Sequence, residues 1–120
     1  MANVLIVDDS SSMRQMISFT LTQASHKVTE AVDGAEGLKI AGSGSFELII
    51  SDINMPNMDG ITLVTELRKL PSYKYTPILL LTTESATDKK KAGRAAGATG
   101  WLVKPFNPDQ LIATANKVLA

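Results

Sequence analysis

Five short apolar runs, separated by segments with helical periodicity, constrain the fold of this chain more than any other feature. Three of the runs, Val4–Val7, Leu48–Ile50 and Ile78–Leu81, are continuous, as expected of strands buried on both faces of a sheet. Lys27–Ala31 alternates and is expected nearer the sheet edge, and Trp101–Val103 is expected to form the fifth strand. Strands that alternate with helices predict an α/β protein, with a parallel sheet and helices on both faces.

Each apolar run is followed by a segment in which apolar residues recur every three or four positions, the spacing of an amphipathic helix. Residues that can cap a helix stand at the start of four of these segments: one of Ser10 to Ser12 for the first, and Asp33, Asp59 and Asn107 for the others. The remaining segment, residues 86–96, predicts the weakest helix because it is rich in alanine and contains glycine.

Length and charge exclude several classes of protein. A chain of 120 residues has the size of one domain, and we expect a single domain over residues 1–120 with no output domain. The 12 basic and 12 acidic residues cancel, which argues against a nucleic-acid binder, and the chain has no cysteine for a disulfide or thiolate site. No signal peptide is apparent, and the longest apolar run is too short to cross a bilayer. We therefore expect a cytoplasmic protein that binds neither nucleic acid nor membranes.

Polar side chains follow four of the five predicted strands. Because parallel strands end at the same edge of a sheet, these side chains are expected to meet there, and ligands of such sheets bind at that edge. The residues are Asp8 and Asp9 after the first strand, Asp52 after the third, Thr82, Thr83 and Glu84 after the fourth, and Lys104 and Pro105 after the fifth.

The chemistry of these residues indicates phosphoryl transfer. Three carboxylates in one crevice repel one another unless a cation neutralises them, and an oxygen-only cluster suits Mg²⁺. Lys104 and the Thr82 hydroxyl could then bind phosphoryl oxygens. The sequence has no Ser–His or Cys–His pair to act as nucleophile, so a carboxylate is the candidate, and Asp52 is predicted to become an aspartyl phosphate.

A simpler interpretation exists for each of these residues taken alone. An acid after a strand is generally a helix cap or a turn former, and a lysine before a proline is a weak signal. The functional interpretation is favoured because complementary chemistry follows four separate strands, whereas chance should scatter acids and lysines over both edges of the sheet.

Four segments, "VLIVDDSSSMR", "DINMPNMDG", "LLLTTE" and "KPF", occur in the order found in a known family. With them the sequence resembles the receiver domains of two-component response regulators, in particular the single-domain, CheY-like chemotaxis type. The resemblance covers essentially the whole chain. It implies a flavodoxin-like (βα)5 three-layer sandwich with a five-stranded parallel sheet of order 2-1-3-4-5, an order already known for flavodoxin and CheY.

The resemblance assigns the phosphoacceptor and the metal ligands. Asp52 matches the phosphoacceptor. Asp9 matches the direct Mg²⁺ ligand, and Asp8 matches the acid that acts largely through water. Asn54 matches the position whose backbone carbonyl completes the metal shell. Asn54 and Glu84 also match positions that tune the attack of water on the acyl phosphate.

The resemblance also assigns the residues of a switch. Thr82 matches the hydroxyl that turns toward the phosphoryl group, and Lys104 matches the lysine that binds it. Pro105 matches a proline that follows this lysine through a cis peptide bond. Trp101 matches the switch aromatic, where the family usually has Tyr or Phe. Simple packing of a partly buried Trp101 is the competing interpretation.

The resemblance implies a phosphorylation-activated signalling switch and not an enzyme, although the protein would assist its own phosphotransfer and slow autodephosphorylation. A CheA-like histidine kinase would be the phosphodonor, a phosphatase could be a further partner, and a monomer would signal by binding, with the flagellar motor switch protein as the expected target. A phosphate relay or sink, or a non-flagellar target, stays open.

Two other classes of protein share features with this chain. A Mg²⁺-dependent phosphatase of the haloacid-dehalogenase type would place its nucleophile after the first strand in a DxD arrangement, whereas this chain reads "VDDSS" there. A flavin-binding electron carrier would need a hydroxyl- and glycine-rich loop at the same place, and Asp8 and Asp9 would repel its phosphate.

Overall fold

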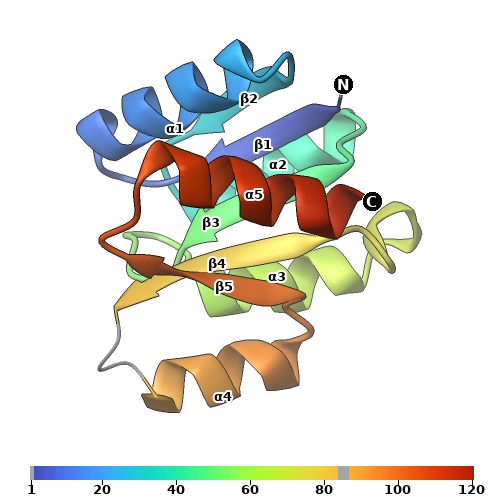
Figure 1. Ribbon diagram of the computed structural model, residues 1–120. Coiled ribbons are helices and arrows are strands. Elements are labelled where there is room, and N and C mark those ends of the chain that lie inside the picture. The colour runs from blue at the N-terminus through green and yellow to red at the C-terminus, as the bar shows by residue number, and fades with distance from the viewer. Residues whose placement is uncertain (1, 84–86) are drawn as a thin grey trace.

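The computed structural model describes residues 2–83 and 87–120, which form one parallel sheet covered by helices (Figure 1). The strands in this part of the chain are β1 (Asn3–Val7), β2 (Lys27–Ala31), β3 (Leu48–Asp52), β4 (Ile78–Thr83) and β5 (Gly100–Lys104). They are ordered β2-β1-β3-β4-β5, and every neighbouring pair is parallel. The predicted α/β class and the strand order 2-1-3-4-5 are therefore confirmed.

Helices cover both faces of the sheet and complete a three-layer structure (Figure 1). They are α1 (Ser11–Gln23), α2 (Gly34–Ser43), α3 (Gly60–Arg68), α4 (Thr87–Ala96) and α5 (Pro108–Leu119), with a short 3-10 helix, η1 (Pro71–Tyr73), that the sequence did not predict. The α1 and α5 helices pack on one face, and α2, α3 and α4 lie on the other. None of the described helices is both long and apolar enough to cross a membrane.

Successive residues of each strand contribute to opposite faces, so the sheet is buried between two hydrophobic clusters. In β1, Val4 and Ile6 face α1 and α5, whereas Leu5 and Val7 face α2 and α3. This double burial explains why the central strands are continuous apolar runs in the sequence. The strand β2 is more exposed, in agreement with its predicted place near the edge.

Four helices begin at the residues that the sequence predicted as caps. The side chains of Ser10, Asp33, Asp59 and Asn107 each accept a hydrogen bond from a backbone N–H in the first turn of the following helix. Asn107 also forms a reciprocal capping box with Gln110. These caps fix where each chain segment leaves the edge of the sheet, and so they position the loops that carry the polar residues.

The strand registers bring these loops into line. Val7 pairs with Ser51, Asp52 pairs with Leu81, and Thr83 pairs with Lys104. The residue after Val7 is therefore a close neighbour of Asp52, and β5 delivers Lys104 to the same edge.

Candidate functional site

The site begins with Asp8, which follows the last residue of β1. Its side chain is buried, and Oδ1 accepts a hydrogen bond of 2.9 Å from the Ser10 N–H. Within the described parts of the chain Oδ2 has no hydrogen-bond partner. A buried carboxylate oxygen without a partner is costly, and such an oxygen is suited to a metal ion or to a water bound to one.

Asp8, Asp9 and Asp52 form a cluster in which one carboxylate oxygen from each residue lies within 4.8 Å of the others. Asp9 is exposed and Asp52 is half-buried. Burial raises the pKa of Asp8 above 3.8, and the negative charges of Asp52 and Asp9 add to the rise, against the Ser10 N–H and Lys104. A divalent cation would remove this repulsion, and the all-oxygen donor set fits Mg²⁺.

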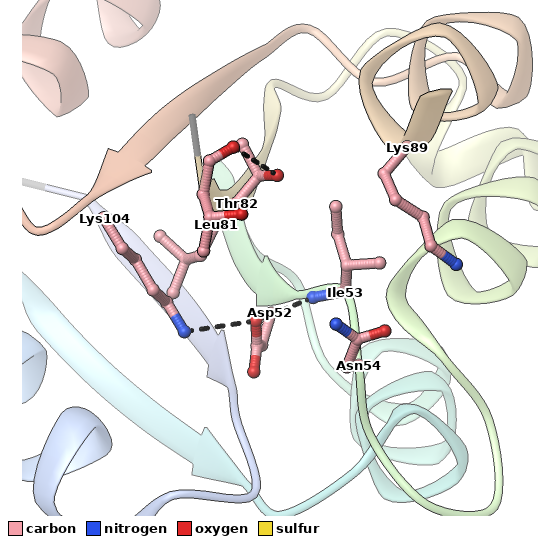
Figure 2. A pocket seen from close by; sticks show the side chains of 8 residues that line it. Asp52, Ile53, Asn54, Leu81, Thr82, Lys89 and Lys104 are labelled. Atoms are coloured by element: carbon pink, nitrogen blue, oxygen red, sulfur yellow. Dashed lines mark hydrogen bonds and ion pairs between the residues drawn. The ribbon is translucent and has the colours of Figure 1, made fainter. Parts of the chain in front are cut away.

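Asp52 stands at the end of β3 in contact with a lysine from β5. Its Oδ1 accepts hydrogen bonds from the Ile53 N–H at 2.9 Å and from the Lys104 Nζ at 3.3 Å (Figure 2). The side chains of Lys104 and Asp52 are 26% and 15% exposed, so the ion pair is only partly shielded from water. Both hydrogen bonds are accepted by Oδ1, and Oδ2 takes part in neither of them.

A cavity of about 130 Å³ opens beside Asp52 (Figure 2). Its lining comes from β3, β4, α4 and β5 and from the loop after β3: Asp52, Ile53, Asn54, Leu81, Thr82, Thr83, Lys89 and Lys104. A water molecule takes about 30 Å³ in the liquid, so the cavity has the volume of about four waters. That volume accommodates a phosphoryl group or a small anion next to the carboxylate.

Two further residues with predicted roles, Thr82 and Asn54, line this pocket. Thr82 is buried, and its hydroxyl donates to the Thr83 carbonyl over 3.4 Å, a long contact that a better acceptor could replace. Asn54 is exposed and lies beside Asp52 (Figure 2). The peptide bond between Lys104 and Pro105 is cis. Glu84, predicted to tune hydrolysis, lies outside the described residues.

Trp101 lies apart from this pocket, on β5 next to α4. Its side chain is half-buried, and its Nε1 is buried without a hydrogen-bond partner among the described residues. The guanidinium of Arg94 lies 5.2 Å from the ring centroid. Trp101 pairs with Leu80 across β4 and β5, two residues before Thr82 and on the same face of the sheet.

The structure adds two residues that the sequence did not assign to the site. Arg14 donates from Nη1 to the Asp8 carbonyl at 2.6 Å and from Nε to Glu30 at 3.2 Å, so it fixes the loop that carries the first acids. Lys89 is exposed on α4 and lines the cavity beside Asp52. No sequence signal identifies either residue, because each contact depends on how a helix is rotated against the sheet.

Comparison with known protein families shows to which family the chain belongs. Residues 4–116 match the family described as "Response regulator receiver domain", and the chain belongs to that family. Among solved structures, the chemotaxis response regulator CheY4 of Vibrio cholerae is 54% identical, with a TM-score of 0.94 and 98% of each chain covered. The Francisella response regulator 1452 receiver domain is 32% identical with a TM-score of 0.89, over 99% of this chain and 97% of that one.

Relatives of known name include longer proteins. The transcriptional regulatory protein PrrA of Mycobacterium tuberculosis is 39% identical over 116 residues, which are 97% of this chain and 49% of PrrA. The transcriptional regulatory protein SrrA of Staphylococcus aureus is 33% identical over 97% of this chain and 47% of SrrA. The chain thus spans about half the length of these relatives.

Proposed function

We propose that this protein is a signalling switch in which a histidine kinase phosphorylates Asp52. The observation that carries the proposal is the convergence of three carboxylates, a lysine and a cavity at one edge of the sheet. In the transfer, an Asp52 carboxylate oxygen forms a bond to phosphorus while the donor's N–P bond breaks. The electron pair of the N–P bond stays on the histidine nitrogen. The imidazole leaves neutral if its other ring nitrogen carries a proton, and otherwise takes up a proton as it leaves. The attacking group is a carboxylate, so the step needs no general base.

Mg²⁺ fits the acid cluster, and Asp8, Asp9, Asp52 and the Asn54 carbonyl would hold it. When bound, it would neutralise the carboxylates and the transferred oxygens. Asp9 is the exposed member of the cluster and Asp8 the buried one, so the two acids would hold the ion between solvent and the sheet. Lys104 would bind the phosphoryl group, and the Thr82 hydroxyl would donate to it in place of the Thr83 carbonyl.

A movement of Thr82 could couple phosphorylation of Asp52 to a change of the protein surface around Trp101 and α4. Thr82 and Trp101 share a face of the sheet and are separated by Leu80 on β4, which also lies under α4. A shift of Thr82 toward Asp52 would leave space into which Trp101 or α4 could repack. Asn54 and Glu84 would tune how fast water removes the phosphoryl group.

We further propose that the chain acts as a cytoplasmic monomer whose output is binding of another protein, with the flagellar motor switch as the first target to test. CheY4, which is similar over 98% of both chains, carries the name chemotaxis response regulator, and this name supports a role in chemotaxis. PrrA and SrrA carry the name transcriptional regulatory protein, and so a non-flagellar output, or a relay or sink for phosphate, is the alternative. A haloacid-dehalogenase-type phosphatase is disfavoured because the pocket centres on the end of β3 rather than β1.

The phosphoacceptor can be tested with Mg²⁺, a small phosphodonor and intact-mass measurement. We expect the protein to gain one phosphoryl group and lose it slowly, and folded Asp52→Asn to gain none. Asp59→Asn is the matched control, because it changes an acid in the same loop but keeps a good helix cap. Undiminished labelling of folded Asp52→Asn would refute the assignment, and rapid turnover of many donor equivalents would favour the phosphatase.

The metal site and the partner need separate experiments. Mg²⁺ should bind much more weakly to Asp9→Ala than to the unsubstituted protein, and equal affinity would place the ion elsewhere. Purified flagellar motor switch protein should bind the phosphorylated form more tightly than the unphosphorylated form. Equal affinities would remove this target from the proposal.

A further inference from the structure

The pocket beside Asp52 contains a second ammonium group besides Lys104. Lys89 is the third residue of α4, and its side chain lines the cavity. Figure 2 shows Lys104 and Lys89 on opposite sides of Asp52 and Asn54. The two lysines come from elements on opposite sides of the cavity, so a ligand that enters it meets positive charge on both walls.

The two lysines differ in how they are held. Lys104 already forms an ion pair with Asp52 at 3.3 Å. Lys89 is exposed and has no ion-pair or hydrogen-bond partner within residues 2–83 and 87–120. A lysine without a partner on the wall of a pocket is available to an incoming anion.

Charge balance indicates which ligand Lys89 suits. Asp8, Asp9 and Asp52 bring three negative charges to the site, and Lys104 with a divalent cation offsets them. A phosphodonor that carries negative charges of its own would make the site negative again. A further cation would favour the approach of that donor by a local, salt-sensitive attraction.

Resting on the proposed phosphorylation of Asp52, we propose that Lys89 is a specificity-determining residue that binds the phosphate of anionic phosphodonors in this pocket. For an acyl phosphate, an Asp52 oxygen bonds to phosphorus as the donor's acyl O–P bond breaks. The electron pair leaves on the carboxylate of the donor, and no proton has to move. Lys89 holds the phosphate during this approach and after it.

Two neighbouring lysines provide matched controls. Lys90 and Lys91 follow directly on α4 but line a different hollow, with Thr87, Arg94 and Trp101. A Lys91→Glu substitution changes the net charge of the protein as much as Lys89→Glu does, but it changes no group that lines the cavity at Asp52. A glutamate at residue 89 also suits the first turn of a helix, so the fold of α4 should survive.

The experiment measures the initial rate of Asp52 phosphorylation by acetyl phosphate, with saturating Mg²⁺, by intact mass. Because exposed charge interactions are weak, we expect Lys89→Gln to slow the reaction about threefold and Lys89→Glu about tenfold. Lys89→Arg should retain most of the rate, and Lys91→Glu should change it less than about twofold. The loss in Lys89→Glu should shrink at high salt.

Every outcome bears on the proposal. A slow Lys89→Glu beside a normal Lys91→Glu supports it. Equal slowing by both substitutions would show a general field effect and overturn it, as would an unchanged rate in Lys89→Gln. If the unsubstituted protein gains no phosphoryl group, the proposed phosphorylation fails and the role of Lys89 falls with it. If Asp52 is labelled normally in all Lys89 variants, only the role of Lys89 fails.

Discussion

The helices α4 and α5 both adjoin β5, on opposite faces of the sheet, but they are held in very different ways. The α5 helix has a capping box at Asn107 and buries Leu111 and Ala115 in the core that it shares with α1. Among the described residues of α4, Gly93 is the buried one. Apolar burial therefore holds α5, whereas α4 depends on a few contacts that other elements provide. The helix beside the pocket is the one that a small change in free energy can move.

Among the described residues, three contacts join α4 and the residue after it to different neighbouring elements. Leu80 packs closely on Gly93, Arg94 covers the ring of Trp101, and Arg68 on α3 donates to the carbonyl of Gly97 just after the helix. The first contact joins α4 to β4, the second to β5 and the third to α3. Each one can be removed singly, and so the contrast with α5 can be tested step by step.

The largest effect is expected from truncating the core side of α5. Leu111→Ala should lower the free energy of unfolding by about 3–4 kcal/mol, because it removes buried methyl groups and leaves a cavity. On α4, the exposed Lys91→Ala should change it by less than about 0.5 kcal/mol. Urea unfolding measures both. If Leu111→Ala costs no more than the α4 variant, the distinction between the two helices is wrong.

The second largest effect is expected from removing the hydrogen bonds that Arg68 forms at the end of α4. Arg68 donates to the carbonyls of Gly97, Tyr73 and Thr76, at 2.7–3.0 Å. Arg68→Met leaves these partly buried carbonyls without their donor and should cost about 2–3 kcal/mol. Amide exchange should rise around residues 97–99.

The neighbouring Lys69 supplies the control for the Arg68 substitution. Lys69 forms a surface ion pair with Glu66 at 2.9 Å, and Lys69→Met should therefore change stability by less than about 0.5 kcal/mol. Exchange that stays unaltered at residues 97–99 in Arg68→Met would show that α4 is anchored by other contacts.

Much of this organisation could be read from the sequence, because it follows local rules. Continuous apolar runs predicted the central strands, and polar residues after them predicted the edge where Asp8, Asp52 and Lys104 meet. The helix caps at Ser10 and Asn107 were also correct. In each case neighbouring residues of the chain, or the common direction of parallel strands, determined the result.

The tertiary contacts of α4 could not be read in this way. Gly93 was interpreted as a weak point of a helix, but a Cβ there would lie 2.8 Å from Leu80 Cδ1, so the glycine permits close packing on the sheet. Gly97 follows α4 with a φ of +109°, a left-handed conformation that favours glycine, and it ends the helix. The placement of Lys89 and Arg68 depends on the rotation of α4 and α3, which periodicity does not specify.

The third prediction concerns the loss of stability caused by burying the ionised carboxylate of Asp8, on the face of the sheet that α1 and α5 cover. Asp8 follows β1 on the α1 and α5 face, and burial raises its pKa. A raised pKa in the folded state means that stability from the protonated form is present below pH 3.8 and is lost as pH rises through the folded pKa. Metal-free Asp8→Asn should therefore be about 1–2 kcal/mol more stable than the unsubstituted protein at pH 7.

Unfolding in EDTA at several pH values checks this expectation. The advantage of Asp8→Asn should diminish as the pH falls through the raised folded-state pKa of Asp8, because the unsubstituted carboxyl then gains its proton in the folded state. Asp9→Asn is the control, because Asp9 is exposed and should gain less. A stability difference that does not depend on pH would contradict the assignment of the cost to ionised Asp8.

The fourth prediction uses a matched pair of glycines. Gly93→Ala should lower stability by about 1 kcal/mol, since the new methyl group must displace the buried end of Leu80 and this outweighs the gain in helix propensity. Gly42→Ala, near the end of α2, meets nothing within 4 Å and should raise stability by up to about 1 kcal/mol. A stabilising Gly93→Ala would show that α4 is free to move outward at no cost.

The smallest effect is expected at the contact between Arg94 and Trp101. Arg94 is exposed and its guanidinium lies 5.2 Å from the ring centroid, a geometry worth about 0.5–1 kcal/mol at a surface site. Arg94→Gln should cost about that amount and shift the emission of Trp101 to longer wavelength, because water replaces the guanidinium over the ring. The sequence contains one tryptophan, so the emission reports this residue alone.

Lys90→Gln is the control for this contact, because Lys90 lines the same hollow, whereas the cation over the ring is that of Arg94. It should leave the emission unchanged. If phosphorylation moves α4, a stable phosphoryl mimic should change the Trp101 emission of the unsubstituted protein. The change should be smaller in Arg94→Gln, because the ring of Trp101 has already lost its contact with the guanidinium on α4. An equal change of emission in both proteins would mean that the surroundings of Trp101 change through Thr82 and β4 rather than through α4. The contrast between α4 and α5 would then concern stability and not signalling.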